Sequence, residues 1–115
     1  MPRNMSFALT TNQVRAEIKD ITRRFGWWFL KPGDRLWAVE KAMGLKKGEQ
    51  VVRLKLIEVV STRGEKLNDI TPEECVREGF PHYTPQMFVD MIVRHHKCKP
   101  GAWINRIEFR YVEEK

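Results

Sequence analysis

The stretch from residue 51 to 60 most constrains the fold of this chain, because it is rich in β-branched side chains and alternates in polarity. On one side of the alternation fall Val52, Leu54 and Leu56, and on the other fall Arg53 and Lys55. A period of two residues is that of a β-strand with one face buried and one in water. The sequence therefore predicts a long strand that is half exposed.

Shorter strands are expected on either side of this one. Residues 5–9 (MSFAL) and 35–39 (RLWAV) have the composition of strands. Turn residues at 32–34 (PGD) and 46–49 (KKGE) separate these segments. The residues that indicate a closing strand, or a pair of strands, are Trp103, Ile104, Ile107, Phe109 and Tyr111.

Two helices are predicted in the second half of the chain by the same local pattern. Thr71 and Thr84 are suitable N-cap residues, and each precedes a proline at the first helical position. We expect helices over residues 72–78 and about 85–96, the second lying across the barrel described below. The side chains expected to face the core from this second helix are Met87, Phe88, Met91, Ile92 and His95.

A third, short helix is expected from Thr10 or Thr11 to about Ile18. Several short strands with a few helices in one small chain place the protein in the α+β class. The simplest architecture is a small, partly closed β-barrel whose ends are covered by short helices.

The composition favours one domain over the whole chain, residues 1–115, because 115 residues with 42% hydrophobic side chains suffice for one core. No apolar run approaches the roughly 20 residues that cross a bilayer, and the N-terminal residues lack the apolar segment of a secretory signal. Two cysteines, Cys75 and Cys98, fit a reducing compartment. We therefore expect a cytoplasmic protein without a membrane partner, and we favour a monomer.

Positive charge is concentrated in the first part of the chain. The net charge is +6, and residues 1–66 hold 14 Lys or Arg against 7 Asp or Glu, whereas residues 67–115 hold 7 against 8. This excess of positive charge favours an anionic partner such as nucleic acid.

The segment 19–34 adds aromatic side chains to this charge. Phosphates bind Arg and Lys, and bases stack on aromatic rings, so the mixture suits a nucleotide. The residues assigned to binding RNA or a modified nucleoside are Arg23, Arg24, Trp27, Trp28, Lys31, Lys46 and Lys47. The alternative is a basic strand and loop whose tryptophans close a small barrel.

No metal or other cofactor is expected. The candidate zinc ligands are Cys75, His82, His95 or His96, and Cys98, and their gaps do not follow the usual paired spacing.

The order of several short motifs resembles the ASCH domain family, whose relatives share the PUA-like fold of domains found in RNA-modifying enzymes. The resemblance covers about residues 5–112 and looks closest to short ASCH proteins of bacteria and phages. The motifs that carry it lie at 19–24 (KDITRR), 31–34 (KPGD), 71–80 (TPEECVREGF), 84–88 (TPQMF) and 106–109 (RIEF).

The ASCH signature runs Gly, any residue, Lys, two of any residue, Glu, any residue, Arg. Lys19 and Arg24 match it, whereas Glu17 replaces the glycine and Thr22 replaces the glutamate. Asp20 stands where many relatives have threonine, and its charge beside Lys19 would favour a protonated amine.

Threonine at this place is similar to the small ASCH enzymes that hydrolyse N4-acetylcytidine to cytidine and acetate. The resemblance implies Lys19, Thr22 and Glu78 as catalytic residues, and a shift of one helical turn would select Glu74 in place of Glu78.

Amide hydrolysis needs a nucleophile, a base and donors for the oxyanion. Thr22 would be the nucleophile, and Lys19 its base if burial and the charges of Arg23 and Arg24 depress a lysine pKa that is ordinarily about 10.4. Glu78 would act on the leaving amine or on water.

Three other functions remain open from the sequence. The chain is alternatively a non-catalytic RNA-binding module, a ribonuclease, or a domain that binds an acidic protein.

Overall fold

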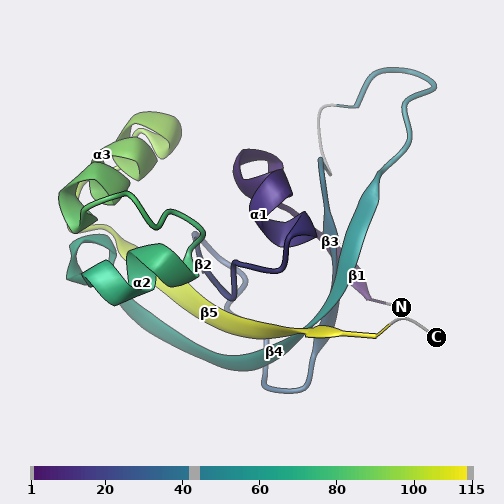
Figure 1. Cartoon of the computed structure of the whole chain (residues 1–115), viewed down its shortest axis with the longest axis horizontal. Coiled ribbons are helices and arrows are strands. Elements are labelled where there is room, and N and C mark those ends of the chain that lie inside the picture. The colour runs from purple at the N-terminus through teal and green to yellow at the C-terminus, as the bar shows by residue number, and fades with distance from the viewer. Residues whose placement is uncertain (1, 42–44, 114–115) are drawn as a thin grey trace.

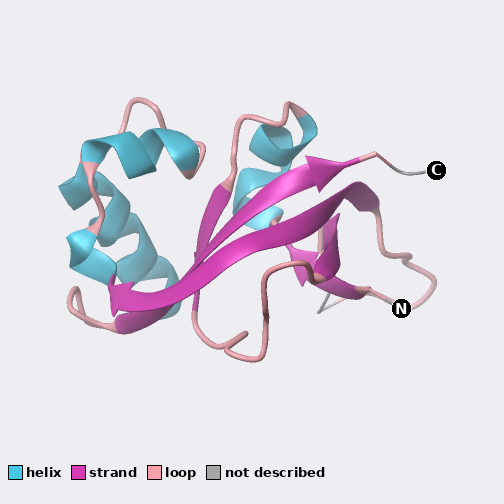
Figure 2. Cartoon of the chain, turned by 90° about the horizontal axis from the view of Figure 1, so that it is seen from below, coloured by secondary structure: helices cyan, strands magenta, loops and turns pink. Residues whose placement is uncertain are grey.

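The computed structural model of the chain describes residues 2–41 and 45–113, so positions 1, 42–44, 114 and 115 of the expected domain lie outside the described residues. It contains a five-stranded sheet of order β1-β3-β4-β5-β2, in which β1 runs parallel to β3 and the other neighbours are antiparallel. The strands are β1 (Arg3–Ser6), β2 (Ile21–Arg24), β3 (Arg35–Val39), β4 (Arg53–Lys66) and β5 (Trp103–Val112). The sheet curls into part of a barrel (Figures 1 and 2). The α+β class and the partly closed barrel are confirmed.

The long strand predicted at 51–60 is present, but its inner face differs from the expectation. β4 begins at Arg53, and its buried side chains are Ile57 and Val59, whereas Val52 lies before the strand and is exposed. The pairing of β3 with β4 shifts register between Ala38 and Val39. Alternation failed here because each face mixes polar and apolar residues: Arg53 and Lys55 share a face with Ile57 and Val59, and Glu58 lies on the other, so the period alone does not choose the inner one.

The closing segment is one strand, β5, rather than a pair. It pairs along β4 from Leu56 opposite Val112 to Lys66 opposite Trp103, with a bulge between Val59 and Ser61. The two strands form a long twisted ribbon (Figures 1 and 2).

The N-terminal strand is shorter and earlier than residues 5–9. β1 ends at Ser6, and the chain turns through η1 (Ala8–Thr10) into α1 (Thr11–Arg15). Helix α1 ends before Ile18 because Glu17 adopts a left-handed φ of 57° and the amide of Ile18 bonds back to the carbonyl of Gln13.

The two later helices begin where the sequence predicts. In α2 (Pro72–Arg77) the Thr71 side chain accepts a hydrogen bond from the amide of Glu74, and in α3 (Pro85–His96) Thr84 accepts from the amide of Met87. The turn at 46–49 also forms, closed by a bond from the amide of Glu49 to the carbonyl of Lys46. Among the described residues, no helix has the length and apolar character needed to traverse a bilayer.

Helix α3 does not lie across the barrel. It packs against α2 and the short turn η2 (Leu67–Asp69) at one end of the β4–β5 ribbon, as Figure 1 shows. Phe88 and Ile92 are buried there, but Met87 and His95 are exposed, contrary to the expected core assignment. The reason is that α3 covers only the end of the ribbon, so its inward stripe is narrow.

Among the described residues, most buried apolar side chains accordingly fall into two clusters. One fills the curled sheet beneath α1 and contains Met5, Phe7, Val14, Leu30, Leu36, Ala38, Ile57, Val59, Ile107 and Phe109. The other joins α2 and α3 to the ribbon and contains Leu67, Ile70, Cys75, Phe88, Val89, Ile92 and Ile104. The candidate site described next lies where these two parts of the molecule meet.

Gly79 ends α2 in a conformation that other residues rarely adopt. Its φ is 96°, and a Cβ there would lie 2.8 Å from Cγ of Gln13. We expect Gly79→Ala to lower the free energy of unfolding by about 1–2 kcal/mol, measured by urea denaturation. Gly101→Ala is the control, because a Cβ at Gly101 meets nothing within 4 Å. Equal stability of the two variants would contradict this prediction.

Candidate functional site

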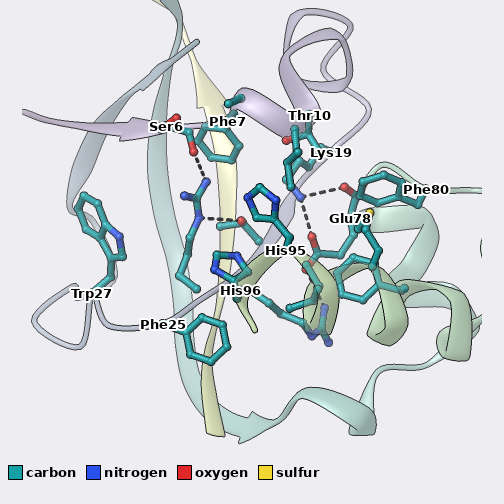
Figure 3. A pocket seen from close by; sticks show the side chains of 18 residues that line it. Ser6, Phe7, Thr10, Lys19, Phe25, Trp27, Glu78, Phe80, His95 and His96 are labelled. Carbon is teal, nitrogen blue, oxygen red and sulfur yellow. Dashed lines mark hydrogen bonds and ion pairs between the residues drawn. The ribbon is translucent and has the colours of Figure 1, made fainter. Parts of the chain in front are cut away.

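A cavity of about 380 Å³ opens between the η1 turn, β2 and α3. Its charged and hydroxyl-bearing lining residues include Thr10, Lys19, Thr22, Arg23, Arg24 and Glu78. Its aromatic and imidazole lining residues are Phe7, Phe25, Trp27, Phe80, Phe88, His95 and His96. Figure 3 shows Lys19 and Glu78 on one side of this cavity, with Phe25 and Trp27 on the other. All three predicted catalytic residues therefore line one space.

Lys19 is held at the buried end of the cavity, just before β2. Its Nζ donates hydrogen bonds to Oε1 of Glu78 at 2.6 Å and to the carbonyl of Glu78 at 2.8 Å (Figure 3). Its own carbonyl accepts a hydrogen bond from the hydroxyl of Tyr111. The acidic neighbour Asp20 does not bind this amine, because its carboxylate pairs with Arg77.

The environment of Lys19 lowers the pKa of its amine. Burial lowers the pKa of Lys19 most, Glu78 raises it, and the positive charges of Arg24 and Arg23 lower it further. The net direction is downward, which is the change that a lysine needs to accept a proton near neutral pH.

Thr22 points into the same cavity from β2 and receives a hydrogen bond from its neighbour Arg24. Nε of Arg24 donates to Oγ1 of Thr22 at 3.1 Å, and its Nη2 donates to the carbonyl of Ser6. The guanidinium also lies 4.7 Å from the ring centre of Phe7. Burial lowers the pKa of Arg24 to about 10. A partly buried cation thus lies beside the hydroxyl oxygen, where it stabilises negative charge on that oxygen or on a bound carbonyl.

Glu78 is placed by the end of α2. The amide of Phe80 donates a hydrogen bond to the carbonyl of Cys75, and the amide of Gly79 donates one to the carbonyl of Val76. These two bonds close the last helical turn. Both carboxylate oxygens of Glu78 are engaged, Oε1 by Lys19 and Oε2 by Arg23 at 3.0 Å. Of the two glutamates considered from the sequence, Glu78 lines the cavity.

Glu74 lies one turn earlier on α2 and is not part of the cavity lining. Its carboxylate binds Arg106 and Arg23 instead.

The residues assigned to nucleotide binding are separated by the fold. Trp27 lines the cavity, whereas Trp28 is exposed and lies outside its lining. Lys31, Lys46 and Lys47 are exposed and do not line it either.

Several lining residues were not assigned to this site from the sequence. His95 and His96 come from the end of α3, and His96 packs on Phe25 with ring centres 5.1 Å apart. Burial lowers the pKa of His96, and His95 and Arg24 act in the same direction. No local signal identifies these residues, because their role depends on α3 facing β2. In the part of the chain that the structure describes, no three His, Cys, Asp or Glu side chains gather as a metal site.

Comparison with known proteins identifies the fold. No family model and no curated protein matches the sequence. An ASCH domain structure from Lactobacillus crispatus JV V101 matches with a TM-score of 0.64 and 11% identity, covering 95% of this chain and 78% of that one. This similarity is therefore one of fold, at low sequence identity.

Two further solved structures agree with this result. Protein EF3133 from Enterococcus faecalis V583, a DUF984 protein, matches with a TM-score of 0.64 and 14% identity over 97% of this chain and 77% of that one. Hypothetical protein PH0355 matches with a TM-score of 0.67 and 14% identity over 97% of this chain and 100% of that one. The chain has an ASCH-like, PUA-like fold.

Proposed function

We propose that this protein is an amidohydrolase that removes the acetyl group from N4-acetylcytidine or a closely related acylated cytidine. The observation that carries the proposal is the meeting of Lys19, Thr22 and Glu78 in one buried, positively charged end of an aromatic-lined cavity. A volume of about 380 Å³ is in the range of small-molecule sites and suits a nucleoside.

The proposed route is covalent. Oγ1 of Thr22 attacks the acetyl carbonyl while its proton passes to the amine of Lys19, and Arg24 stabilises the oxyanion. Cleavage of the C–N bond leaves acetyl-Thr22 and releases cytidine, whose exocyclic nitrogen takes the proton from Lys19. Water then hydrolyses the ester, which gives acetate and restores the hydroxyl. Glu78 orients the amine of Lys19 throughout.

The aromatic walls suit the base. Phe25 and Trp27 lie opposite the charged end, and rings of this kind stack on nucleobases. A base bound between them would present its exocyclic acetyl group to Thr22.

The test is direct incubation of the purified protein with N4-acetylcytidine, with cytidine measured by chromatography. We expect turnover, and the absence of product at equimolar enzyme would reject the proposal. An oligonucleotide that contains one N4-acetylcytidine, assayed in parallel, distinguishes a nucleoside substrate from one within RNA.

A second candidate, binding of single-stranded RNA without catalysis, is favoured by the loop beside the cavity. Trp28 and Phe29 are 53% and 55% exposed, and the guanidinium of Arg3 lies 4.9 Å from the ring centre of Phe29. Exposed rings with cations suit stacked bases. This function predicts affinity that falls steeply with salt, and Trp28→Ala should weaken it. Cleavage of the RNA in the same assay would indicate a nuclease instead.

A further inference from the structure

A row of three arginines crosses the sheet behind the candidate site. Arg23 of β2 pairs in register with Arg106 of β5, which pairs on its other side with Arg63 of β4. Residues opposite one another in a sheet project from the same face. Three like charges therefore lie side by side, which is unfavourable unless anions lie between them.

Glu74 of α2 and Glu65 of β4 supply those anions. Arg106 donates to Oε1 of Glu74 at 2.9 Å through Nε and to Oε2 at 2.7 Å through Nη2. Glu65 binds Arg63 through one oxygen and Arg23 through the other, at 3.3 and 2.8 Å. Hydrogen bonds from Arg106, with those from Arg23, lower the pKa of Glu74 to about 2, so Glu74 carries its charge throughout the neutral range.

Arg23 joins this network to the cavity. Its Nη2 binds Glu65 and Glu74, and its Nη1 binds Oε2 of Glu78 at 3.0 Å. The Arg23 side chain is only 1% exposed. Because three carboxylates surround this guanidinium, it is not available to a phosphate.

We infer that Arg23 is a positioning residue: anchored from behind by Glu65 and Glu74, its guanidinium holds one oxygen of Glu78 so that the other faces the amine of Lys19. The effect of Arg23 on catalysis rests on the proposed hydrolase function. The contact by which Arg23 places Glu78 exists whether or not the protein hydrolyses an amide. A planar guanidinium suits this role because its fork contacts several carboxylates at fixed angles.

The variant that tests the inference is Arg23→Gln/Glu65→Gln, which removes one cation and one anion from the network. The readout without substrate is the titration midpoint of Lys19, followed by NMR in protein labelled at lysine Cε and assigned with Lys19→Met. We expect a higher midpoint for two reasons. The positive charge of Arg23, which lowers the pKa of Lys19, is lost, and Glu78, which raises that pKa, no longer shares its carboxylate with Arg23. An unchanged or lower midpoint in the folded variant would overturn the inference.

The matched control is Arg15→Gln/Glu40→Gln, which removes an ion pair whose two side chains are about half exposed. It is expected to leave the Lys19 midpoint unchanged. A shift equal to that of the test variant would show a general charge effect and would also overturn the inference.

Activity provides the second readout. If the wild type hydrolyses N4-acetylcytidine, the test variant should lose roughly 10- to 100-fold in kcat with KM nearly unchanged, and the rise of kcat with pH should move to higher pH. A purely structural role would leave the pH midpoint in place. If the wild type is inactive, the hydrolase proposal fails while the NMR titration still decides the role of Arg23.

Arg23→Lys serves if the double variant does not fold, because it keeps the buried cation. An ammonium has a single nitrogen, so it cannot hold Glu78 from one position and Glu65 and Glu74 from another, as Nη1 and Nη2 do. We therefore expect its crystal structure to show the carboxylate of Glu78 displaced from the position found here. An undisplaced carboxylate would contradict the positioning role.

Discussion

Thr22→Val should abolish hydrolysis of N4-acetylcytidine, with kcat/KM at least about 10³-fold lower than in the wild type. Valine keeps the β-branched shape of threonine, so β2 retains its pairing with β5, and only the hydroxyl is lost. The substitution also removes the acceptor that Oγ1 provides to Nε of Arg24. The measurement is steady-state kinetics with a thermal melt to confirm folding.

Thr22→Ser is the matched control, because it restores the hydroxyl without the methyl group. We expect it to remain within about tenfold of the wild type in kcat/KM. If the valine variant also stays within tenfold, Thr22 is not the nucleophile and water attacks the acetyl carbonyl directly.

Glu78→Gln should cause the largest loss of stability, about 3–5 kcal/mol at pH 6 by urea denaturation. Lys19 and Arg23 have side chains that are 2% and 1% exposed, and both lose a carboxylate partner. Arg23 keeps Glu65 and Glu74, but Lys19 is left buried without a carboxylate. A buried cation without its anion costs far more than an exposed pair contributes.

The pH dependence of this variant has a definite sign. Burial already lowers the pKa of Lys19 below its ordinary 10.5, and loss of Glu78 removes the interaction that raises it. Between the folded and unfolded pKa values the unfolded chain binds more protons, so stability rises with pH in that window. We expect the destabilisation to be greatest at low pH and to shrink as pH rises towards 10.5.

Two comparisons make this prediction specific. Lys19→Met/Glu78→Gln removes both charges and should recover part of the loss. Glu40→Gln breaks the exposed pair with Arg15 and should change stability by less than about 1 kcal/mol. Similar losses of stability in Glu40→Gln and Glu78→Gln would show that the buried ion pair contributes no more to stability than the exposed one.

The elements that the sequence predicted well are those fixed by near neighbours in the chain. Both Thr-Pro helix starts act through a hydrogen bond to an amide three residues on, so α2 and α3 begin where expected. The inner face of β4 depended on the register with β3 and β5, and the location of α3 depended on the end of the ribbon. Neither is encoded within a short window.

The candidate site was likewise predicted only in part from the sequence. The resemblance to ASCH domains selected Lys19, Thr22 and Glu78, which line one cavity. From the sequence, Arg23 was assigned to phosphate binding, because it is a basic residue beside aromatic ones. The sequence does not indicate which carboxylates surround it in the fold. Its partners come from β4 and α2, far away in the chain.

The class of fold, the helix starts and the chemical groups offered to a ligand can be read from the amino-acid sequence, since these depend on residue type and short-range hydrogen bonds. Which charges are buried together, and which aromatic rings enclose them, follows from the packing of distant segments. The pKa of Lys19 and the orientation of Glu78 are set by burial and by charges from separate elements, which meet only when the sheet and α2 have packed.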